Sequence, residues 1–178
     1  GSQLVEAGRY AEAEAELLVA LEYYERRHDE RDPIVPYVLL DLGRARAGMG
    51  LLSEGLIYLE DALAHWEGAL GGDHPKLAWA WREIGDVQLE LGDRSAAKRA
   101  FAAALRTHDV TTSDPLHLGD LNFGMAQALI EEDHQDAIRY AHRALRLYRG
   151  SAYRVNEAES VDVFLRRYDS PSSEPSFP

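Results

Sequence analysis

The chain has 178 residues, of which 46% are hydrophobic, so it can bury a core and does not have the composition of a disordered or fibrous protein. Its 31 acidic residues outnumber 19 basic ones, and the formal net charge of −12 repels phosphate and anionic lipid, which excludes nucleic acid and acidic membrane as natural partners. The absence of cysteine excludes disulfides, thiolate nucleophiles and cysteine-held metals. The sequence also has no apolar run long enough for a membrane helix and no signal segment, so we expect a cytoplasmic protein.

Three glycines divide the first part of the chain into repeats of equal length. Gly8, Gly50 and Gly92 lie 42 residues apart, and each opens a segment that ends in an Ala-Leu pair. A fixed period of about 20 to 50 residues indicates a repeat protein, in which each unit buries its apolar face by stacking on its neighbours. The three pairs are Ala20-Leu21, Ala62-Leu63 and Ala104-Leu105.

The elements predicted in chain order are all helices. Apolar residues recur at three- and four-residue spacings, as in Leu56, Leu59 and Leu63, and alternating β-branched residues are nearly absent. In the joint between the second and third repeats, we expect Asp73 to cap the next helix and Pro75 to lie in its first turn. The predicted segments are a half repeat at 3–30, repeats at 34–70, 75–108 and 115–148, a closing helix at 156–168 and a disordered tail at 169–178.

Small residues recur where two helices of one repeat would cross. Gly43 and Gly85 each precede a turn glycine by seven residues, and Gly55 follows one by five residues. Because the side chain is missing or small, the two helix axes can approach closely there, and a larger apolar residue such as Leu59 or Phe101 fills the space one turn further on.

The two ends of the repeat array differ from its middle. Gly1-Ser2 has the sequence of a tag-cleavage scar, and Gln3 lies so close to Gly8 that the first repeat lacks nearly all of its first helix. A lone second helix leaves an apolar face uncovered. We therefore expect either that the chain was cut from a longer one or that another subunit covers this face, which would make a homo-oligomer through the N-terminal end helix.

The third repeat carries a family resemblance. Trp81 to Gln88 matches the pattern W-x2-L-G-x2-Y, and Ala97 to Phe101 matches A-x3-F, so the chain resembles tetratricopeptide repeat proteins. The resemblance implies an all-α, right-handed solenoid of antiparallel helix pairs, with a truncated first repeat and a C-terminal capping helix. The 42-residue period is similar to the longer repeats of kinesin light chains and of bacterial signalling proteins.

The fourth repeat departs from this pattern. Ala137, Ala141 and Ala144 fit a second helix, but Gly124 lies one residue too early unless the turn at 131–134 is longer than in the other repeats. The register of this repeat therefore depends on the length of one turn.

No enzyme motif is present, so we expect a non-catalytic protein without a cofactor. The sequence has no glycine-rich phosphate loop, no G-x-S-x-G elbow and no H-E-x-x-H helix. The best metal-like cluster lacks the spacing of a calcium loop and is interpreted as a solvated turn, so no metal site is predicted. That cluster consists of Glu131, Glu132, Asp133, His134 and Asp136.

The resemblance places the candidate site in a concave groove lined by the first helices. Carried onto this sequence, the groove positions are Tyr37, Leu40, Asp41, Arg44, Trp79, Arg82, Glu83 and Asp86, followed by Asn122 and Phe123 in the fourth repeat. Aromatic and arginine side chains are typical anchors at protein interfaces. Two alternatives stay open: the aromatic residues pack against the preceding repeat, and the arginines pair with nearby carboxylates rather than with a ligand.

These observations favour a protein-interaction module. We expect it to bind a peptide or partner protein in the groove, as the regulatory part of a larger bacterial signalling protein. The set of residues that grips a C-terminal carboxylate in chaperone-binding members of the family is mostly missing here. The alternative hypothesis is a structural scaffold that mediates self-association or domain packing.

Overall fold

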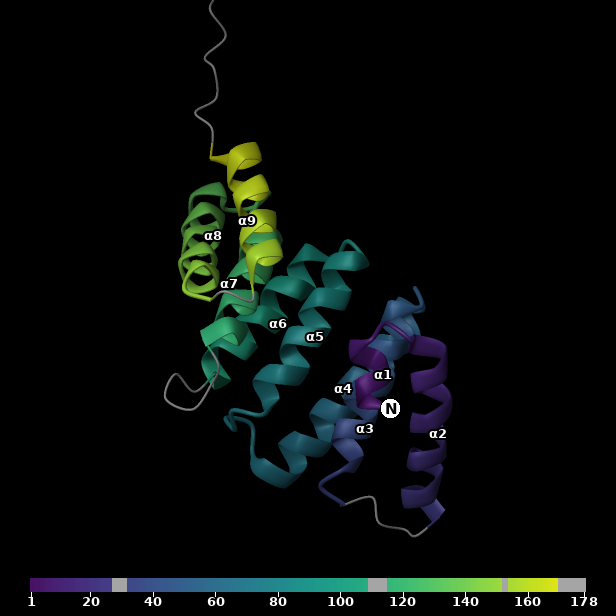
Figure 1. The fold of residues 1–178 in the computed structure, drawn as a ribbon. Helices are drawn as coiled ribbons and strands as arrows, with labels where there is room; N and C mark the ends of the chain where they lie inside the picture. Colours follow the sequence, from purple (N-terminus) through teal and green to yellow (C-terminus); the bar gives the residue numbers. More distant parts are fainter. Residues whose placement is uncertain (27–31, 109–114, 152–153, 170–178) are drawn as a thin grey trace, which may run out of the picture. The chain divides into compact units, whose positions relative to one another are not determined.

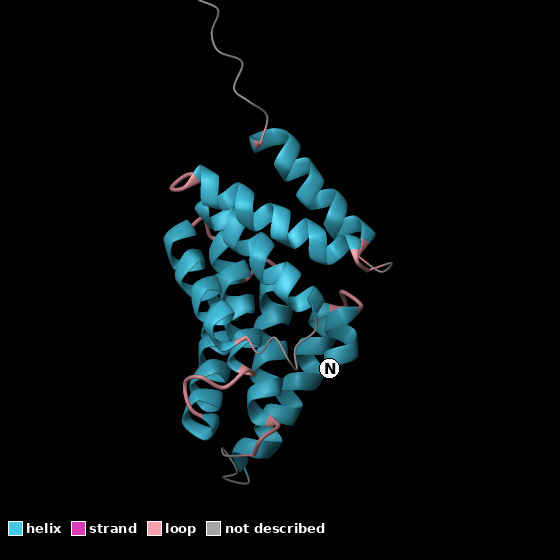
Figure 2. Ribbon diagram, turned by 90° about the vertical axis from the view of Figure 1, so that its left-hand side faces the viewer, coloured by secondary structure: helices cyan, strands magenta, loops and turns pink. Residues whose placement is uncertain are grey.

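We describe the fold from a computed structural model that places residues 1–26, 32–108, 115–151 and 154–169 (Figure 1). The expected disordered tail lies outside these residues except for Asp169. Throughout the described ranges every regular element is a helix and there is no strand (Figure 2). None of these helices combines the length and the apolar character needed to cross a membrane. The chain divides into two compact units, residues 1–109 and 110–178, which are described separately.

Unit 1 is a stack of helix pairs. Each pair is joined by a short turn and packs on the next pair, since α2 contacts α3 and α4 contacts α5 (Figure 1). The first helices also meet, because α1 contacts α3 and α3 contacts α5. The helices are α1 (Ser2–Glu6), α2 (Tyr10–Arg26), α3 (Val35–Gly48), α4 (Leu52–Leu70), α5 (Leu77–Glu90) and α6 (Arg94–Thr107).

The repeated glycines are the turns within the pairs. Gly8, Gly50 and Gly92 have φ angles of 71°, 80° and 83°, in the left-handed region that side chains disfavour. After the third turn, Asp93 caps α6 by accepting a hydrogen bond from the backbone N–H of Ala96 at 2.8 Å. The glycines that repeat every 42 residues are therefore the turn residues that adopt the left-handed conformation.

The joint between the second and third repeats differs from the prediction. The helix α5 begins at Leu77, and its N-cap is Lys76 rather than Asp73, so Pro75 lies outside the first turn. Instead, the Nδ1 atom of His74 accepts a hydrogen bond from the backbone N–H of Lys76 at 3.2 Å. The physical reason is that two polar residues follow the glycines, and the one closer to the helix provides the acceptor.

The small residues make close helix crossings, as expected. A Cβ atom built on Gly43 would lie 2.6 Å from the Leu59 side chain and 2.9 Å from the carbonyl oxygen of Gly55, so α3 and α4 touch backbone to backbone. A Cβ atom on Gly85 would lie 2.7 Å from the Phe101 ring. These crossings hold each pair together, and Leu59 and Phe101 are fully buried beside them.

Unit 2 consists of one further helix pair and a closing helix: α7 (Pro115–Leu129), α8 (His134–Arg149) and α9 (Val155–Tyr168). The helix α9 packs on α8 through the buried residues Val161 and Leu165. Its Phe164 ring meets the Phe123 ring of α7 edge to face, with centroids 5.8 Å apart. The closing helix therefore covers an apolar face of the last pair.

The turn of the last pair is longer by one residue. In the third repeat two residues separate the end of α5 at Glu90 from the cap Asp93, whereas three separate the end of α7 at Leu129 from the cap Asp133. This is the longer turn that the sequence pattern required for the register of the fourth repeat. Gly124 and Gly85 then lie at the same distance from the ends of their helices.

A buried tyrosine connects all three helices of unit 2. Tyr148 on α8 is 2% exposed and its ring fills the space beside Gly119 on α7. Its hydroxyl donates a hydrogen bond to Asp120 at 2.7 Å, and Arg154, at the start of α9, lies 3.6 Å from the same carboxylate. Burial, together with the charge of Asp120, raises the pKa of the Tyr148 hydroxyl far above its ordinary value of 10.0.

This tyrosine predicts an alkaline loss of stability in unit 2. The folded chain keeps Tyr148 neutral while the unfolded chain ionises near pH 10, so its contribution is complete below pH 10 and falls by about 1.4 kcal/mol for each further pH unit. Tyr148→Phe is expected to be less stable than the natural chain by about 1 kcal/mol at pH 8, because the hydrogen bond is lost. Urea unfolding at pH 8 and pH 11 measures this gap, which should narrow or reverse at pH 11. A gap that stays constant contradicts the assignment.

Candidate functional site

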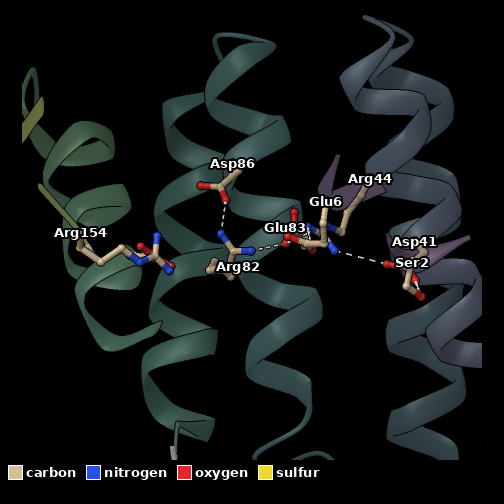
Figure 3. A network of polar contacts seen from close by, with 9 residues as sticks. Ser2, Glu6, Asp41, Arg44, Arg82, Glu83, Asp86 and Arg154 are labelled. Carbon is tan, nitrogen blue, oxygen red and sulfur yellow. Dashed lines mark hydrogen bonds and ion pairs between the residues drawn. The ribbon is translucent and has the colours of Figure 1, made fainter. Parts of the chain in front are cut away.

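The predicted groove residues of unit 1 lie on neighbouring first helices. Residues 42 positions apart occupy equivalent places on α3 and α5, which pairs Tyr37 with Trp79, Leu40 with Arg82, Asp41 with Glu83, and Arg44 with Asp86. The short helix α1 continues the row, and its Ser2 and Glu6 reach the same residues (Figure 3). We call this surface the first-helix face; it consists of Ser2, Glu6, Tyr37, Asp41, Arg44, Trp79, Arg82, Glu83 and Asp86.

Arg44 is the centre of the polar contacts on this face. Its guanidinium lies 2.6 Å from Glu6 on α1, 3.3 Å from Asp41 on α3 and 3.5 Å from Glu83 on α5 (Figure 3). Burial alone would lower the pKa of Arg44, but the charges of Glu83, Glu6 and Asp41 raise it above its ordinary value. One side chain therefore ties three successive first helices together.

Asp41 supports this centre from inside the protein. The residue is only 7% exposed, and it accepts a short hydrogen bond from the Ser2 hydroxyl in addition to its pairing with Arg44. A buried carboxylate is costly unless it is paired and hydrogen-bonded. Asp41 is therefore a positioning residue of the face rather than a group that faces solvent.

Arg82 makes the second set of contacts. It forms a short ion pair with Glu83 and a second one with Asp86 at 3.1 Å, both on its own helix (Figure 3). The sequence left open whether the arginines bind a ligand or pair with nearby carboxylates. In the structure they pair with carboxylates of the same protein. The face carries four carboxylates against two guanidinium groups, and both guanidinium groups already contact carboxylates.

Two aromatic side chains remain open to solvent on the same face. Tyr37 is 42% exposed and Trp79 is 51% exposed. The Tyr37 ring meets Trp66 of its own repeat edge to face at 5.1 Å, and the ammonium group of Lys76 lies 5.3 Å from its centroid. The exposed part of the Tyr37 ring is thus already used as a platform for a cation.

Three other predicted site residues are buried or partly buried within their own unit. Leu40 is buried in the core of unit 1. In unit 2, Asn122 is buried and donates its side-chain amide to the carbonyl of Leu118 at 2.7 Å, and Phe123 packs against Phe164. They support their helices and leave the first-helix face as the accessible part of the predicted site.

A comparison with protein families matches residues 37–108 to the model described as tetratricopeptide repeat. Residues 37–108 carry tetratricopeptide repeats. The matched region contains α3 to α6, and its pairs have the glycine crossings that the resemblance implied. No curated protein matches the chain. Tetratricopeptide repeats generally mediate protein–protein interactions and are typically non-catalytic. The kinesin-light-chain-like form of the repeat stays a prediction.

A hollow in unit 1 was not predicted from the sequence. It has a volume of about 750 Å³ and is lined by Pro33, Pro36, Trp66, Leu70 and Lys76, among others. Trp66 and Lys76 both also contact the Tyr37 ring. Since the prolines precede or begin α3 and Lys76 precedes α5, only the fold brings them together, and no local pattern could have shown it.

The acidic turn of unit 2 has structural roles. Asp133 caps α8 by accepting the backbone N–H of Asp136 at 2.9 Å, and the side chain of Asp136 pairs with Arg139. Within the described part of the chain, no group of three or more histidine, cysteine or acidic residues is arranged to hold a metal ion.

Proposed function

We propose that unit 1 binds a segment of a partner protein on the first-helix face, as part of a larger bacterial signalling protein. The observation that carries the proposal is the pair of exposed aromatic residues, Tyr37 and Trp79, at equivalent places on α3 and α5. Exposed aromatic residues beside a set of fixed charges are typical of anchor positions at interfaces. The placement of this module in a bacterial signalling protein rests on the resemblance of its 42-residue repeats to the long repeats of such proteins.

The charges of the face favour basic residues in the partner. A carboxylate of a partner has to compete with the carboxylates that already contact Arg44 and Arg82. A lysine or arginine of the partner instead meets a surplus of carboxylates, among them the exposed Glu6 and the half-exposed Asp86. Lys76 already lies against the Tyr37 ring, so the carboxylates are the groups that would receive the basic residues. We therefore propose a partner segment that combines apolar and basic side chains.

Selection from a displayed library of nine-residue peptides tests this function. Enriched peptides are expected to contain lysine or arginine. Trp79→Ala is expected to weaken their binding at least tenfold, about 1.4 kcal/mol, because it removes an anchor. Asp86→Asn is expected to weaken it by about fivefold, since it removes one accessible charge while keeping the shape of the side chain. Affinities are measured by fluorescence anisotropy.

Matched controls lie on α4, on the second helix of a pair. Ile57→Ala removes an exposed apolar side chain, and Glu60→Gln removes an exposed carboxylate. Both should leave the affinity within twofold of the natural chain. If Trp79→Ala has no effect while the variants keep their thermal unfolding curves, the face is not the binding site. If Glu60→Gln weakens binding as much as Asp86→Asn, only the overall charge attracts the peptides.

A further inference from the structure

A second hollow of unit 1 is lined by side chains of three helices, α2, α3 and α4. It has a volume of about 330 Å³. Val35 and Leu39 of α3 are 4% and 5% exposed, and with Leu21 of α2 they give the hollow an apolar wall. We call it the tyrosine hollow; its lining residues are Leu21, Tyr24, Val35, Leu39, Tyr58, Asp61 and His65.

Two tyrosines from different helices line this hollow. Tyr24 of α2 and Tyr58 of α4 are both half-buried and pack against the core of unit 1. The Tyr24 ring also meets Tyr23 edge to face, with centroids 5.4 Å apart, which holds the ring in place. The face of an aromatic ring attracts a cation, because the ring carries negative charge above and below its plane. Two fixed rings beside one hollow therefore favour a positively charged ligand.

The polar side chains of the hollow are not engaged by the protein. Asp61 and His65 lie one turn apart on α4, and neither makes a hydrogen bond or an ion pair with another described residue. The same holds for the Tyr58 hydroxyl. By contrast, the carboxylate of Asp41 is paired with Arg44. Asp61 is exposed, so a cation can reach its carboxylate from solvent and pair with it.

The repeat shows that the fold does not require these polar residues. Forty-two residues further on, the equivalents of Tyr58, Asp61 and His65 are small and buried: Ala100, Ala103 and Thr107. The Thr107 hydroxyl donates to carbonyl oxygens of its own helix at 3.2 and 3.3 Å, so its polar group is satisfied internally. Trp66, the equivalent of Tyr24, is only 3% exposed. The third repeat therefore packs the place that the second repeat leaves hollow and polar.

We propose that the tyrosine hollow binds a small organic ammonium ion. The alkyl part of the ligand packs on the apolar wall, and its charged group lies between Tyr24 and Tyr58 and pairs with Asp61. The volume is at the lower end of the range for ligand sites, which suits a small ligand. The net charge of −12 attracts a cation and repels an anion. The hollow shares no residue with the first-helix face, so this proposal and the proposed function fail separately.

Binding of n-butylammonium to the whole chain, followed by chemical-shift changes in NMR spectra, tests the proposal. A Kd of about 1 mM is expected for a ligand of this size. The uncharged n-butanol is expected to bind at least tenfold more weakly, and butyrate is expected not to bind. n-Butyltrimethylammonium separates two kinds of ligand. Tighter binding than n-butylammonium supports a quaternary ammonium held by the rings, and weaker binding supports a primary ammonium that also donates hydrogen bonds to Asp61 and Tyr58.

Substitutions locate the binding in the hollow. Asp61→Asn is expected to weaken n-butylammonium binding about fivefold, because the paired charge is lost. Tyr58→Leu is expected to weaken n-butyltrimethylammonium binding about fivefold, whereas Tyr58→Phe keeps the ring and should change it less than twofold. Two matched controls should also change the affinity less than twofold. Glu60→Gln removes an exposed carboxylate beside Asp61 that does not line the hollow, and Tyr37→Leu removes a tyrosine of the first-helix face.

The opposite outcomes are equally distinct. Equal binding of n-butanol and n-butylammonium overturns the proposal, because the hollow would then select only apolar groups. Equal losses in Glu60→Gln and Asp61→Asn overturn it, since the cation would then respond only to the overall charge. It is also overturned if n-butylammonium at about 50 mM, well above the expected Kd, leaves the spectra unchanged. Thermal unfolding curves show that each variant is folded, and a loss in Tyr37→Leu as large as that in Tyr58→Leu overturns the assignment to this hollow.

Discussion

Replacing Gly43 by alanine is expected to lower the free energy of unfolding of unit 1 by about 3 kcal/mol, the upper range for overpacking a core. The new Cβ atom would lie 2.6 Å from Leu59 and 2.9 Å from the carbonyl oxygen of Gly55. Leu59 is fully buried and has no space to turn into, and the oxygen belongs to the backbone. The helices α3 and α4 must therefore separate, which also disturbs the packing of their neighbours. Urea unfolding followed by circular dichroism measures the loss.

Gly68 provides the matched control on α4. It lies inside the helix with no atom within 4 Å of a built Cβ and without a positive φ angle. Gly68→Ala is therefore expected to stabilise the chain by about 0.5 to 1 kcal/mol, because alanine loses less backbone entropy in a helix. If Gly43→Ala costs no more than about 0.5 kcal/mol, the helices do not approach as closely as the structure shows.

The crossing at Gly43 is the kind of feature that the sequence predicts well. Turn glycines and crossing glycines recur at a fixed period because each repeat must turn and pack in the same way. The sequence also predicted the longer turn before Asp133, because Gly124 fits the repeat pattern only if that turn is lengthened. Both features follow from comparing the backbone positions of one repeat with those of the others.

The repeat pattern does not predict which of the groove residues are exposed. The alignment of the repeats places Leu40 and Arg82 at equivalent positions. Leu40 is buried in the core, whereas Arg82 is partly exposed and pairs with Glu83. Asn122 donates its side-chain amide to the carbonyl four residues earlier, and the Phe123 ring packs against Phe164 of α9. Whether a position is open depends on the neighbouring helices, which the repeat pattern of a single unit does not contain.

Arg44 could be identified from the sequence as a groove residue, but its role could not. The sequence left open whether Arg44 grips a ligand or pairs with nearby carboxylates such as Asp41. The structure adds Glu6 and Glu83, which come from the first helices of the preceding and following repeats. Such contacts join residues 38 and 39 positions apart, so only the stacking of the repeats brings them together.

Replacing Arg44 by methionine is expected to lower the free energy of unfolding by about 2 kcal/mol, below the usual cost of breaking a fully buried pair because the Arg44 side chain is 26% exposed. Methionine keeps the length and the apolar contacts of the side chain but leaves the buried Asp41 without its cation, while Glu83 keeps its pairing with Arg82. Arg44→Lys restores the charge without the planar fork that reaches three carboxylates, so an intermediate loss is expected. Urea unfolding measures both variants.

The control is an arginine whose partner is exposed. Arg9 pairs with Glu12 at the start of α2, where both side chains are largely exposed, and Arg9→Met is expected to change stability by less than about 0.5 kcal/mol. Adding Asp41→Asn to Arg44→Met should recover part of the loss, because the unpaired buried charge is then removed. If the free energy of unfolding is not partly recovered, the loss in Arg44→Met comes from packing and not from an unpaired carboxylate. If it is partly recovered, the charges of the first-helix face hold α1, α3 and α5 together, and the surface proposed to bind a partner is built by its own ion pairs.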